Sequence, residues 1–435
     1  MENKIAVIGG GAAGMMAAIQ AAQAGACVDL YERNDRVGKK LPATGNGRCN
    51  FSNRVMNRDA YYGSAVSFYE KLYRQFGVAE TIDFFSQRGM LIKDRDGYLY
   101  PLSGQASTVL DILRFSLAEY GVRVHTEHKA AALLREQKTG VFSVVCQEDA
   151  KRSYGAVILA CGGMAAPKTG SDGNGYELAK AFGHHVVKVV PALVQLRCTG
   201  DFWKSVAGVR IEAGLTLLIG RKKRAFVRGE LQLTEYGISG IPVFQFSREA
   251  AYALSNGQQV SVEIDFLPDM DPLEERRFWE RRFRLLGERP LEQFLTGLSN
   301  KKINQLIIRQ AGCRPVDTAG TLPGAKKEKL AALYRHFMTV VCKTNGFDQA
   351  QVSAGGIPAG ELTNRLESKL VPRLFFAGEM IDMDGICGGY NLQWAWTSGA
   401  AAGRAAAEAL LRESPVKKAQ GPERKRHQDD QDQSD

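Results

Sequence analysis

The chain opens with a short apolar run that passes directly into glycines. In residues 4–8 (KIAVI), the four residues after Lys4 are apolar and two of them are β-branched isoleucines beside a valine, which predicts a buried strand. The small-residue run 12–25 (AAGMMAAIQAAQAG) predicts a helix that ends at Gly25, and 27–32 (CVDLYE) predicts a second strand. Together these segments predict a β-α-β unit of about 30 residues, the length that such a unit needs.

Between this unit and residue 163 the pattern alternates between helix and strand. Apolar periodicity predicts helices within 64–89 and over 108–121, the second ending at Gly121. DGYLYP at 96–101 predicts a hairpin or a strand. Alternating or continuous apolar runs predict further strands at VRVHT (122–126), AALLRE (131–136), VFSVVCQ (141–147) and GAVILACGG (155–163).

The pattern changes near Val186. Strand-like pieces dominate to residue 266, and the sequence is then helical and charged from Asp271 to about Thr344. Small residues and buried strand character return at SAGGI (353–357) and LFFAGE (374–379). The strand-like pieces are VVKVVPALVQL (186–196), GLTLLIG (214–220), AFVRGELQL (225–233) and VSVEIDF (260–266).

This order of patterns predicts an α/β protein in which a substrate domain is inserted into a nucleotide-binding domain. We expect a Rossmann-like nucleotide-binding domain built from two distant segments. The predicted boundaries are 1–190 and 353–412 for that discontinuous domain, 191–270 for an inserted β-rich domain, 271–352 for an inserted helical subdomain and 413–435 for a polar, disordered tail.

Composition fits a soluble enzyme. Of 435 residues, 44% are hydrophobic and 24% charged, which is ordinary for a globular chain. No uninterrupted apolar run is long enough to predict a membrane span. The eight cysteines form no CxxC pair and no metal-ligand spacing, so we expect reduced thiols, a cytoplasmic location and no bound metal.

The net charge of +10 lies in the folded body, because the acids and bases after Ser414 cancel. Part of the excess lies in GRKKR (220–224) and EERRFWERRFR (274–284). Such runs suit an anionic cofactor, a small anionic substrate or RNA, but solvated surfaces carry them more often. The aromatic residues within 274–284 follow helical core spacing, so a nucleic-acid partner is not the leading prediction.

A dinucleotide-binding loop follows the first strand. Gly9 allows a tight turn, Gly11 allows a pyrophosphate to approach the backbone, and Gly14 allows close packing of helix on strand. The helix N-terminus supplies free N–H groups to the phosphates. Glu32, at the end of the second strand, is placed to accept hydrogen bonds from the ribose hydroxyls. A 2′-phosphate would meet this negative charge, which disfavours NADP at the loop.

Three further stretches favour FAD over NAD as the ligand of this loop. The segment after Glu32, RNDRVGKKLPATGNGRCN (33–50), is rich in glycine and cations, which suits a longer anionic ligand. Glycine turns follow buried strands at ACGG (160–163) and at AGE (377–379). This order is typical of flavoproteins of the two-dinucleotide-fold type.

Four motifs carry a more specific resemblance. They are GNGRCN (45–50), PKTGSDGNGYELA (167–179), LTEYGISGIP (233–242) and AGEMIDMDGICGGYNLQWAWTSGAAAG (377–403). In this order they resemble the BaiN-like flavoproteins, also called aminoacetone-oxidase-family FAD-binding enzymes, over residues 1–412. Thr44 stands where serine is usual in that family, and GISGIP replaces the commoner GISGP.

The resemblance implies that FAD is bound and assigns residues to it. It implies that Ala130 meets the adenine, Glu379 the ribitol, and residues 389–392 the pyrimidine edge of the flavin, where Gly388 and Gly389 let the chain approach the ring. The complete expected set is Gly9, Gly11, Ala12, Ala13, Gly14, Glu32, Arg33, Lys39, Lys40, Gly45, Gly47, Arg48, Cys49, Asn50, Ala130, Cys161, Gly162, Gly163, Gly378, Glu379, Gly389, Tyr390, Asn391 and Leu392.

The resemblance also implies the chemistry, which is NAD(P)H-dependent reduction of a conjugated C=C bond in 3-oxo-bile-acid intermediates. Such a reductase needs a proton donor. Tyr98, Tyr100, Tyr236 and Tyr390 are the candidates, with Tyr390 first. Arg48 and Cys49 are further catalytic candidates, and inert packing is the alternative for the thiols of Cys49 and Cys387. Residues 237–240 (GISG) open a helix whose free N–H groups are expected either to be satisfied by ordinary capping or to bind a substrate carboxylate or carbonyl.

No second strand–GxGxxG–helix unit follows, so NADH or NADPH is expected to visit the flavin through the cavity of the small-molecule substrate. Two alternatives remain open at this point. One is an amine oxidase that uses oxygen, with aminoacetone as the substrate type. The other is a flavoprotein that modifies or binds RNA.

Overall fold

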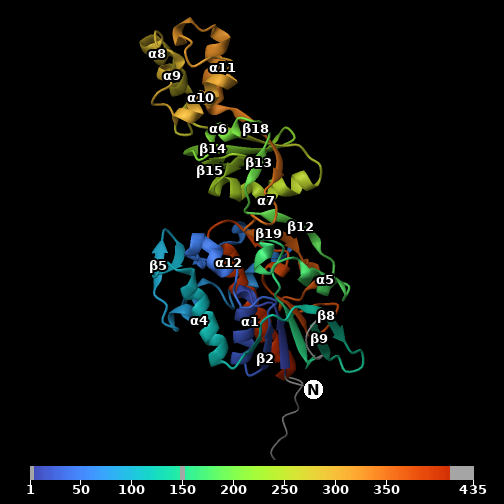
Figure 1. Cartoon of the computed structure of the whole chain (residues 1–435). Coiled ribbons are helices and arrows are strands. Elements are labelled where there is room, and N and C mark those ends of the chain that lie inside the picture. Colours follow the sequence, from blue (N-terminus) through green and yellow to red (C-terminus); the bar gives the residue numbers. More distant parts are fainter. Residues whose placement is uncertain (1–3, 147–151, 412–435) are drawn as a thin grey trace, which may run out of the picture.

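The computed structural model describes residues 4–146 and 152–411 of the chain. The molecule is elongated, with a sheet-containing base, a β-barrel beyond it and a cluster of helices at the far end (Figure 1). We call residues 4–192 and 352–411 the base, and residues 193–351 the insert. The predicted tail, 413–435, lies outside the described residues.

A parallel five-stranded sheet forms the centre of the base. Its order is β20-β11-β1-β2-β7, and each neighbouring pair is parallel. The predicted strands 4–8, 27–32, 155–163 and 374–379 all belong to it, which confirms the α/β class. The bounds are β1 Lys4–Ile8, β2 Cys27–Tyr31, β7 Arg123–His125, β11 Ala156–Leu159 and β20 Leu374–Phe376.

Helices from the two ends of the chain pack together on this sheet. α1 (Ala12–Gln23) contacts β1 and β2, and α12 (Tyr390–Leu411) contacts α1, β11 and β20. A Cβ at Gly399 would lie 2.4 Å from the carbonyl oxygen of Ala13, and one at Gly403 would lie 2.3 Å from that of Ala17. The close contact of α12 with α1 therefore requires glycine at both positions.

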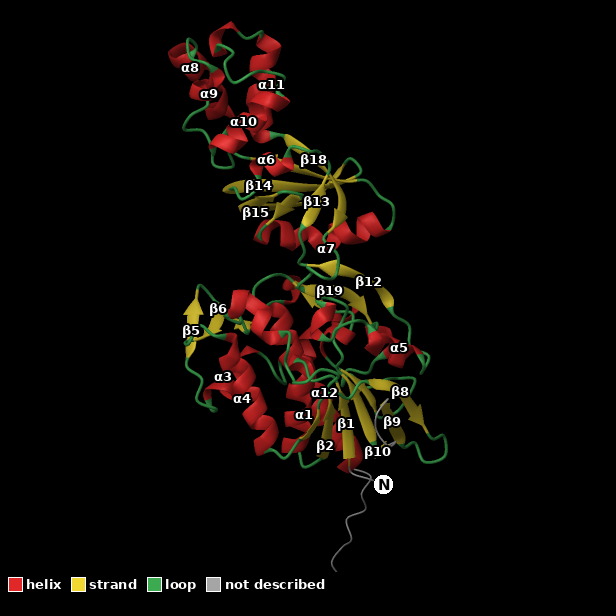
Figure 2. Ribbon diagram, viewed as in Figure 1, coloured by secondary structure: helices red, strands yellow, loops and turns green. Residues whose placement is uncertain are grey.

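The remaining elements of the base surround this core (Figure 2). An antiparallel sheet β10-β9-β8 contacts β1 through β10, and a second small sheet has the order β3-β6-β5. The bounds are β3 Ser52–Asn53, β4 Tyr61–Tyr62, α2 Tyr69–Tyr73, α3 Val78–Ser86, β5 Ile92–Arg95, β6 Tyr98–Pro101, α4 Ala106–Glu119, β8 Ala130–Arg135, β9 Phe142–Cys146, β10 Arg152–Tyr154, α5 Asn174–Lys180 and β21 Asp384–Gly385.

The insert contains a closed barrel with strand order β13-β16-β15-β14-β17-β18. Helix α7 (Ile241–Ser255) lies at the end of the barrel that faces the base (Figure 1). The other bounds are β13 Leu196–Cys198, α6 Trp203–Val206, β14 Arg210–Ile219, β15 Lys222–Thr234, β16 Gly237–Ser239, β17 Val260–Asp265, α8 Pro272–Leu286, α9 Leu291–Phe294, α10 Lys301–Gln310, α11 Gly324–Arg335 and β18 Phe337–Thr344.

The last barrel strand, β18, differs from the predicted pattern. We grouped its residues with the helical segment 271–352, yet they pair with β13 and β17 and close the barrel. Phe337, Thr339 and Val341 are buried in alternation with exposed neighbours. This alternation follows α11 after a single residue, so the helical pattern hid it. The barrel and the far helices also share one hydrophobic core, which includes Trp279 and Tyr334.

Two antiparallel strands, β12 (Val187–Ala192) and β19 (Val352–Gly356), lead into and out of the insert. A buried ion pair adds a further connection. Arg248 Nε of α7 lies 3.0 Å from Asp384 Oδ1 in the base, and the Arg248 guanidinium stands over the rings of Tyr62 and Tyr252. The insert is therefore attached by two strands, an ion pair and aromatic contacts.

Candidate cofactor and active site

A cavity of about 720 Å³ lies where the parallel strands of the base end. The residues directly after β1, β2, β11 and β20 all line it: Gly9, Glu32, Ala160 and Ala377. Parallel strands end at the same edge of a sheet, where α/β proteins bind their ligands. The cavity continues toward the insert, which contributes Leu193, Ile241, Phe244, Ala350 and Gln351 to its wall.

The three glycines of the loop after β1 are needed for different structural reasons. Gly9 has φ +106°, and a Cβ there would lie 2.5 Å from the Ala160 carbonyl oxygen. A Cβ at Gly14 would lie 1.8 Å from the Gly9 carbonyl oxygen. Gly11 has φ −78° and would meet nothing within 4 Å. Its missing side chain thus leaves open space at the N-terminus of α1, where an anionic group is favoured.

Glu32 closes the loop from the end of β2. Its Oε2 accepts a hydrogen bond from Gly10 N at 2.9 Å, and its Oε1 accepts two from Asn34, at 2.8 Å from the backbone and 2.6 Å from the side chain. Each carboxylate oxygen can accept more than one hydrogen bond. The carboxylate is therefore fixed in orientation and lines the cavity with capacity left for a ribose hydroxyl.

The turn before α5 covers the same end of the cavity. Arg33 Nη1 forms an ion pair of 2.5 Å with Asp172 Oδ2, and Asn34 Nδ2 donates to the Thr169 carbonyl oxygen at 3.0 Å. The sequence prediction missed five wall residues of this turn, although its glycines signal a turn: Thr169, Gly170, Ser171, Asp172 and Asn174. Arg33 thus neutralises the charge of Asp172 on the cavity wall.

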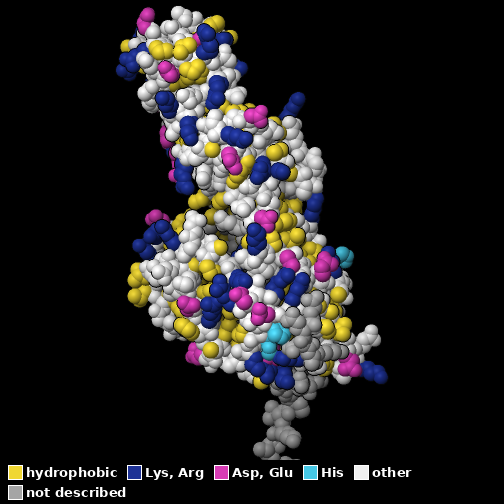
Figure 3. All heavy atoms as spheres, viewed as in Figure 1, with side chains coloured by type: hydrophobic (Ala, Val, Ile, Leu, Met, Phe, Trp, Pro, Cys, Tyr) yellow, Lys and Arg dark blue, Asp and Glu magenta, His cyan; other side chains and the backbone are white. Residues whose placement is uncertain are grey.

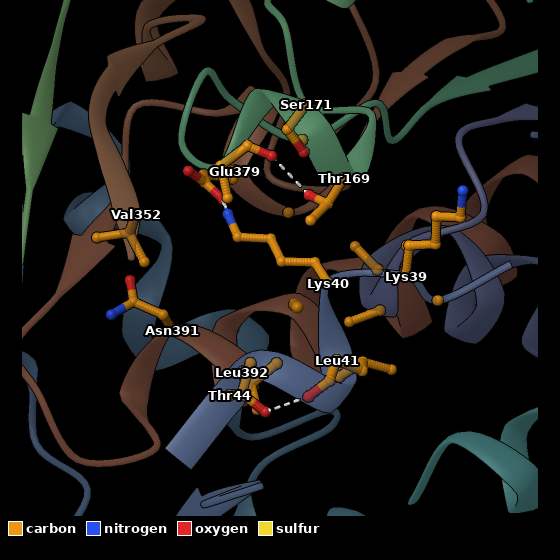
Figure 4. Close-up of a pocket in the computed structure, with 18 of the residues that line it drawn as sticks. Lys39, Lys40, Leu41, Thr44, Thr169, Ser171, Val352, Glu379, Asn391 and Leu392 are labelled. Atoms are coloured by element: carbon orange, nitrogen blue, oxygen red, sulfur yellow. Dashed lines mark hydrogen bonds and ion pairs between the residues drawn. The ribbon is translucent and has the colours of Figure 1, made fainter. Parts of the chain in front are cut away.

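An ion pair crosses the middle of the cavity. Lys40 Nζ lies 3.2 Å from Glu379 Oε2, and Figure 4 shows the lysine extending from the loop after β2 toward the glutamate. Glu379 Oε1 also accepts from Ser353 N at 2.6 Å. Behind Glu379, a Cβ at Gly163 would lie 2.8 Å from Oε1. Gly163 therefore makes room for the acid rather than lining the cavity itself.

The far end of the cavity is built from the start of α12. The first helical hydrogen bond of α12 runs from Gln393 N to Gly389 O. The N–H groups just before Gln393 thus have no helical acceptor, as at every helix start. Asn391 bridges back to both backbone groups of Gly385 at 2.8 Å, which fixes the turn. Asn50 also lines this end, and its Oδ1 is buried without a partner among the described residues.

Most residues expected from the sequence to contact FAD line this one cavity. Those outside the lining are Gly14, Gly47, Cys49, Gly163 and Tyr390. Those on the lining are Gly9, Gly11, Ala12, Ala13, Glu32, Arg33, Lys39, Lys40, Gly45, Arg48, Asn50, Ala130, Cys161, Gly162, Gly378, Glu379, Gly389, Asn391 and Leu392.

Two of the three catalytic candidates are placed away from the cavity. The Tyr390 hydroxyl donates to the Val55 carbonyl oxygen at 2.8 Å, and its ring packs edge-on against Tyr61. Cys49 is fully buried, and burial raises its pKa to about 11, so the thiol stays protonated. Neither residue lines the cavity. Arg48, the third candidate, is exposed and lines the cavity.

Two other tyrosine candidates do line the cavity. Tyr98 and Tyr100 lie two residues apart on β6, on the face opposite to the fully buried Leu99. Burial raises the pKa of Tyr100. Tyr236 is not part of the lining and lies under the guanidinium of Arg197 in the insert. Of the four tyrosine candidates, Tyr98 and Tyr100 of the hairpin β5–β6 are thus the two that line the cavity.

The site fits FAD on three observations. The open space at Gly11 receives a diphosphate at a helix N-terminus, Glu32 provides acceptors for a ribose, and Asn50 Oδ1 is a buried acceptor without a donor among the described residues. A flavin ring carries an N–H that such an acceptor can bind. Fold and site together define an FAD-binding oxidoreductase of the Rossmann type.

The chain belongs to the HI0933-like family, since the sequence profile of the HI0933-like protein Rossmann domain matches residues 3–405. The resemblance stated from the sequence motifs is thereby confirmed. The 3-dehydro-bile acid delta(4,6)-reductase of Clostridium scindens is 42% identical over 410 residues, covering 93% of this chain and 99% of the relative.

More distant relatives cover the chain almost as completely. Two proteins named ribosomal RNA dihydrouridine synthase, from Haemophilus influenzae and Escherichia coli, are each 28% identical, covering 90% of this chain and 95% of the relative. Among solved structures, the 3-ketosteroid-delta4-(5alpha)-dehydrogenase of Rhodococcus jostii has a TM-score of 0.48 at 16% identity, covering 93% of this chain and 96% of that one. That likeness is too weak to bear on function.

Within residues 4–146 and 152–411, no helix has the length and apolar character to cross a membrane. The eight cysteines, all of which lie within those ranges, form no disulfide. Burial raises the pKa of Cys161 to about 12 and also raises that of Cys387, so both cavity-lining thiols are protonated near neutral pH.

Proposed function

We propose that the protein reduces a C=C bond conjugated to a carbonyl group, with NADH or NADPH as the electron donor. The observation that carries this proposal is the 42% identity, over nearly the full length of both chains, to a protein named as a bile acid delta(4,6)-reductase. The name of that relative describes reduction of double bonds near a 3-oxo group. The proposed substrate class is a small enone, with 3-oxo steroids or bile acids as the leading examples.

FAD, when bound, supplies the hydride exchange, and the chain supplies position and charge. Glu32 and the N-terminus of α1 hold the adenosine and the phosphates. Lys40 and Glu379 are the groups that meet the ribitol. The N–H groups at the start of α12, together with Arg48, stabilise negative charge at the far end of the cavity.

We assign the proton donor to Tyr100. It lines the far part of the cavity, beside Arg48, and its raised pKa keeps the hydroxyl protonated across the physiological range. No other described residue accepts its hydroxyl proton in a hydrogen bond, so the proton is free to pass to a substrate carbon. This placement replaces Tyr390, whose hydroxyl is bound to the backbone of Val55.

The insert supplies an apolar wall for the substrate. Ile241 and Phe244 stand at the N-terminal end of α7 and line the cavity together with Leu193 and Met383. Ile241 is 60% exposed and lines the cavity, so an apolar ligand bound there would cover it. A flat, apolar ring system between this wall and the tyrosine face of the hairpin matches the proposed substrate class.

Anaerobic spectroscopy of the purified holoenzyme tests the proposal. We expect NADH or NADPH to bleach the flavin and a 3-oxo-4-ene bile acid to restore its colour with formation of the saturated ketone. Bleaching by aminoacetone alone, with peroxide formed in air, would instead identify the amine oxidase. No bleaching by either nucleotide would refute the proposed electron donor.

A second candidate function comes from the relatives named ribosomal RNA dihydrouridine synthase. Formation of dihydrouridine also saturates a C=C bond conjugated to a carbonyl, so the same cavity chemistry would serve. Ribosomal RNA that lacks the modification should then restore the colour of the reduced flavin, while free enones should not. We also propose a cytoplasmic location, which suits both a small enone and ribosomal RNA as the substrate.

A further inference from the structure

The hairpin β5–β6 presents a particular face to the mouth of the cavity. Along β6, Leu99 is buried in the core, so Tyr98 and Tyr100 point to the other side and line the cavity. Across the hairpin, Lys93 pairs with Tyr100 and Arg95 pairs with Tyr98. Residues directly opposite each other in an antiparallel pair share a face. Two cations and two tyrosines therefore lie on one surface, which we call the hairpin face.

Among the described residues, the cations of the hairpin face have no acidic partners. Lys93 and Arg95 are exposed, and neither forms an ion pair within the described ranges. The Arg95 guanidinium lies 5.8 Å from the centre of the Tyr100 ring. By contrast, Arg54 on the neighbouring segment is paired with Asp94, whose register places it on the Leu99 side. Lys and Arg side chains are visible at this edge of the base, beside the hollow below the barrel (Figure 3).

Charges on an edge strand often serve only to prevent aggregation. Protection against aggregation would not explain why both cations stand opposite the two tyrosines. It would also not explain a third cation, Arg48, on the same cavity wall as the tyrosines. Arg48 is also exposed, lines the same cavity and has no ion-pair partner in the described part of the chain. Arg48 lies on the cavity wall, and Lys93 and Arg95 stand opposite the two tyrosines of that wall. Together the three cations create a positive potential that attracts an anionic ligand.

The hairpin face adjoins the part of the cavity that receives the flavin. A Cβ at Gly388 would lie 2.8 Å from Cε1 of Tyr98, so this ring packs directly on the segment before α12. Cys387, Gly388 and Gly389 line the cavity next to the two tyrosines. A ligand bound to the hairpin face can thus extend one end to the flavin while its charged portion stays at the mouth.

We propose that the hairpin face, together with Arg48, binds the diphosphate of NADH or NADPH while the nicotinamide reaches the flavin. The proposal rests on the proposed function, which requires a nicotinamide donor. The sequence contains only one dinucleotide loop, and that loop is assigned to FAD. Lys93, Arg95 and Arg48 supply the charge that a diphosphate needs, and Tyr98 supplies a ring for stacking.

The test compares flavin reduction in the holoenzyme and in the double variant Lys93→Gln/Arg95→Gln. The rate of anaerobic bleaching is measured against the concentration of NADH and of NADPH. We expect the nucleotide concentration for half-maximal rate to rise about tenfold or more, because each hydrogen bond between charged groups contributes roughly a tenfold factor. The limiting rate, the FAD content and the flavin spectrum should not change.

Arg54→Gln is the matched control. It removes a positive charge from the same region, but its side chain is held by Asp94 away from the cavity. An equal loss of nucleotide affinity in Arg54→Gln would show that only net charge matters and would overturn the proposed site. So would an unchanged affinity in the double variant.

Measurements of flavin reoxidation and of the wild-type enzyme distinguish failure of the hairpin face from failure of the proposed function. If the double variant binds nucleotide normally but needs more of a carboxylated enone than wild type for reoxidation, the hairpin face binds the substrate acid, and the proposal is wrong. A neutral enone serves as the comparison in that arm. If wild-type flavin is not bleached by either nucleotide, the proposed function itself fails. Bleaching of the wild type with no defect in the variant refutes the hairpin face alone.

Discussion

Gly11 is the single residue that best tests the FAD site. Its φ of −78° is open to any amino acid, and a Cβ there meets no atom within 4 Å. Gly11→Val should therefore fold, but its side chain should occupy the space of the cofactor diphosphate. We expect the purified variant to lose at least about nine-tenths of its FAD and to melt near the temperature of the wild-type apoprotein. Absorbance after purification and thermal unfolding provide the two measurements.

Gly324→Val is the control for this substitution. Gly324 lies at the start of α11 in the insert, is exposed, and a Cβ there would also meet no atom within 4 Å. Retention of full FAD in Gly11→Val would contradict the assignment. Gly389 would give a less clear answer, since it has φ +92° and a Cβ there would lie 2.5 Å from the Ser52 carbonyl oxygen. A valine at Gly389 would disturb the backbone whether or not a cofactor is bound.

The assignment of the proton donor gives a second prediction at this scale. Tyr100→Phe should slow reoxidation of the flavin by an enone about 100-fold or more, because the proton source is removed. Flavin reduction by NAD(P)H should remain unchanged in the same variant. Rapid-mixing experiments on the two half-reactions separate these effects. Tyr390→Phe, which removes a hydroxyl bound to backbone, should leave both half-reactions close to wild type, and the reverse pattern would restore Tyr390 as the donor.

Individual residues could be predicted where backbone geometry fixes them. Gly9, Gly11 and Glu32 follow strands of a β-α-β unit, and the structure places all three on the cavity wall. Tyr390 could not be placed in this way. It lies beside the cofactor segment in sequence, but the direction of its hydroxyl depends on the distant Val55 and Tyr61.

At the scale of elements, the sequence predicted the strands and helices of the base well and the end of the insert less well. β18 was missed because a clear alternation began one residue after a helix. The closure of the barrel could not be inferred either, since β13 pairs with β16 and β18 across long sequence separations. Such pairings leave no local periodicity.

His184 follows the helix α5 and is buried beneath two polar side chains of the base. Its Nδ1 lies 2.6 Å from Glu361 Oε2, and its Nε2 lies 2.8 Å from Ser368 Oγ. This resembles the order of groups in a hydrolase triad, but Ser368 Oγ also accepts from Val371 N, and Ser368 is only 4% exposed. The contact is therefore structural.

The ion pair between α7 and the base gives a prediction about pH. Burial raises the pKa of Asp384 to about 6 from its ordinary 3.8, even though Arg248 lowers it. The folded state thus binds this proton more tightly than the unfolded chain. The resulting stabilisation is present below the unfolded pKa and is lost as pH rises through the folded value.

Chemical unfolding of wild type and of Asp384→Asn at two pH values measures this effect. The difference in unfolding free energy, wild type minus variant, should be about 1 kcal/mol larger at pH 5 than at pH 8. The variant lacks the titrating group, so it corrects for all other groups. A difference that is larger at pH 8 would mean that attraction to Arg248 outweighs burial.

At the scale of the whole molecule, the cofactor site joins segments from both ends of the chain. Residues 8–13 and 377–395 contribute to the lining of one cavity, and α1 packs against α12 behind it. Removal of FAD should therefore loosen both segments together. The barrel, which has its own core, should be much less affected.

Hydrogen exchange with and without FAD measures this coupling. In the apoprotein, amides of residues 9–16 and 388–396 should exchange faster to a similar degree, whereas those of β14 and β17 should keep their protection. Restoring FAD should reverse the change and provides the control. Faster exchange in the barrel to the same extent would show that base and insert unfold as one unit.

The joining of the two ends also affects the order of events during synthesis. A ribosome adds roughly 5–20 residues per second. The loop after β1 therefore emerges long before α12, which must pack on α1 and complete the far end of the cavity. For a large part of a minute the growing chain has the phosphate loop, but it lacks α12 and the segment before α12 that completes the cavity. We therefore expect FAD to bind late in synthesis. A chain released before α12 is made would lack a complete FAD site.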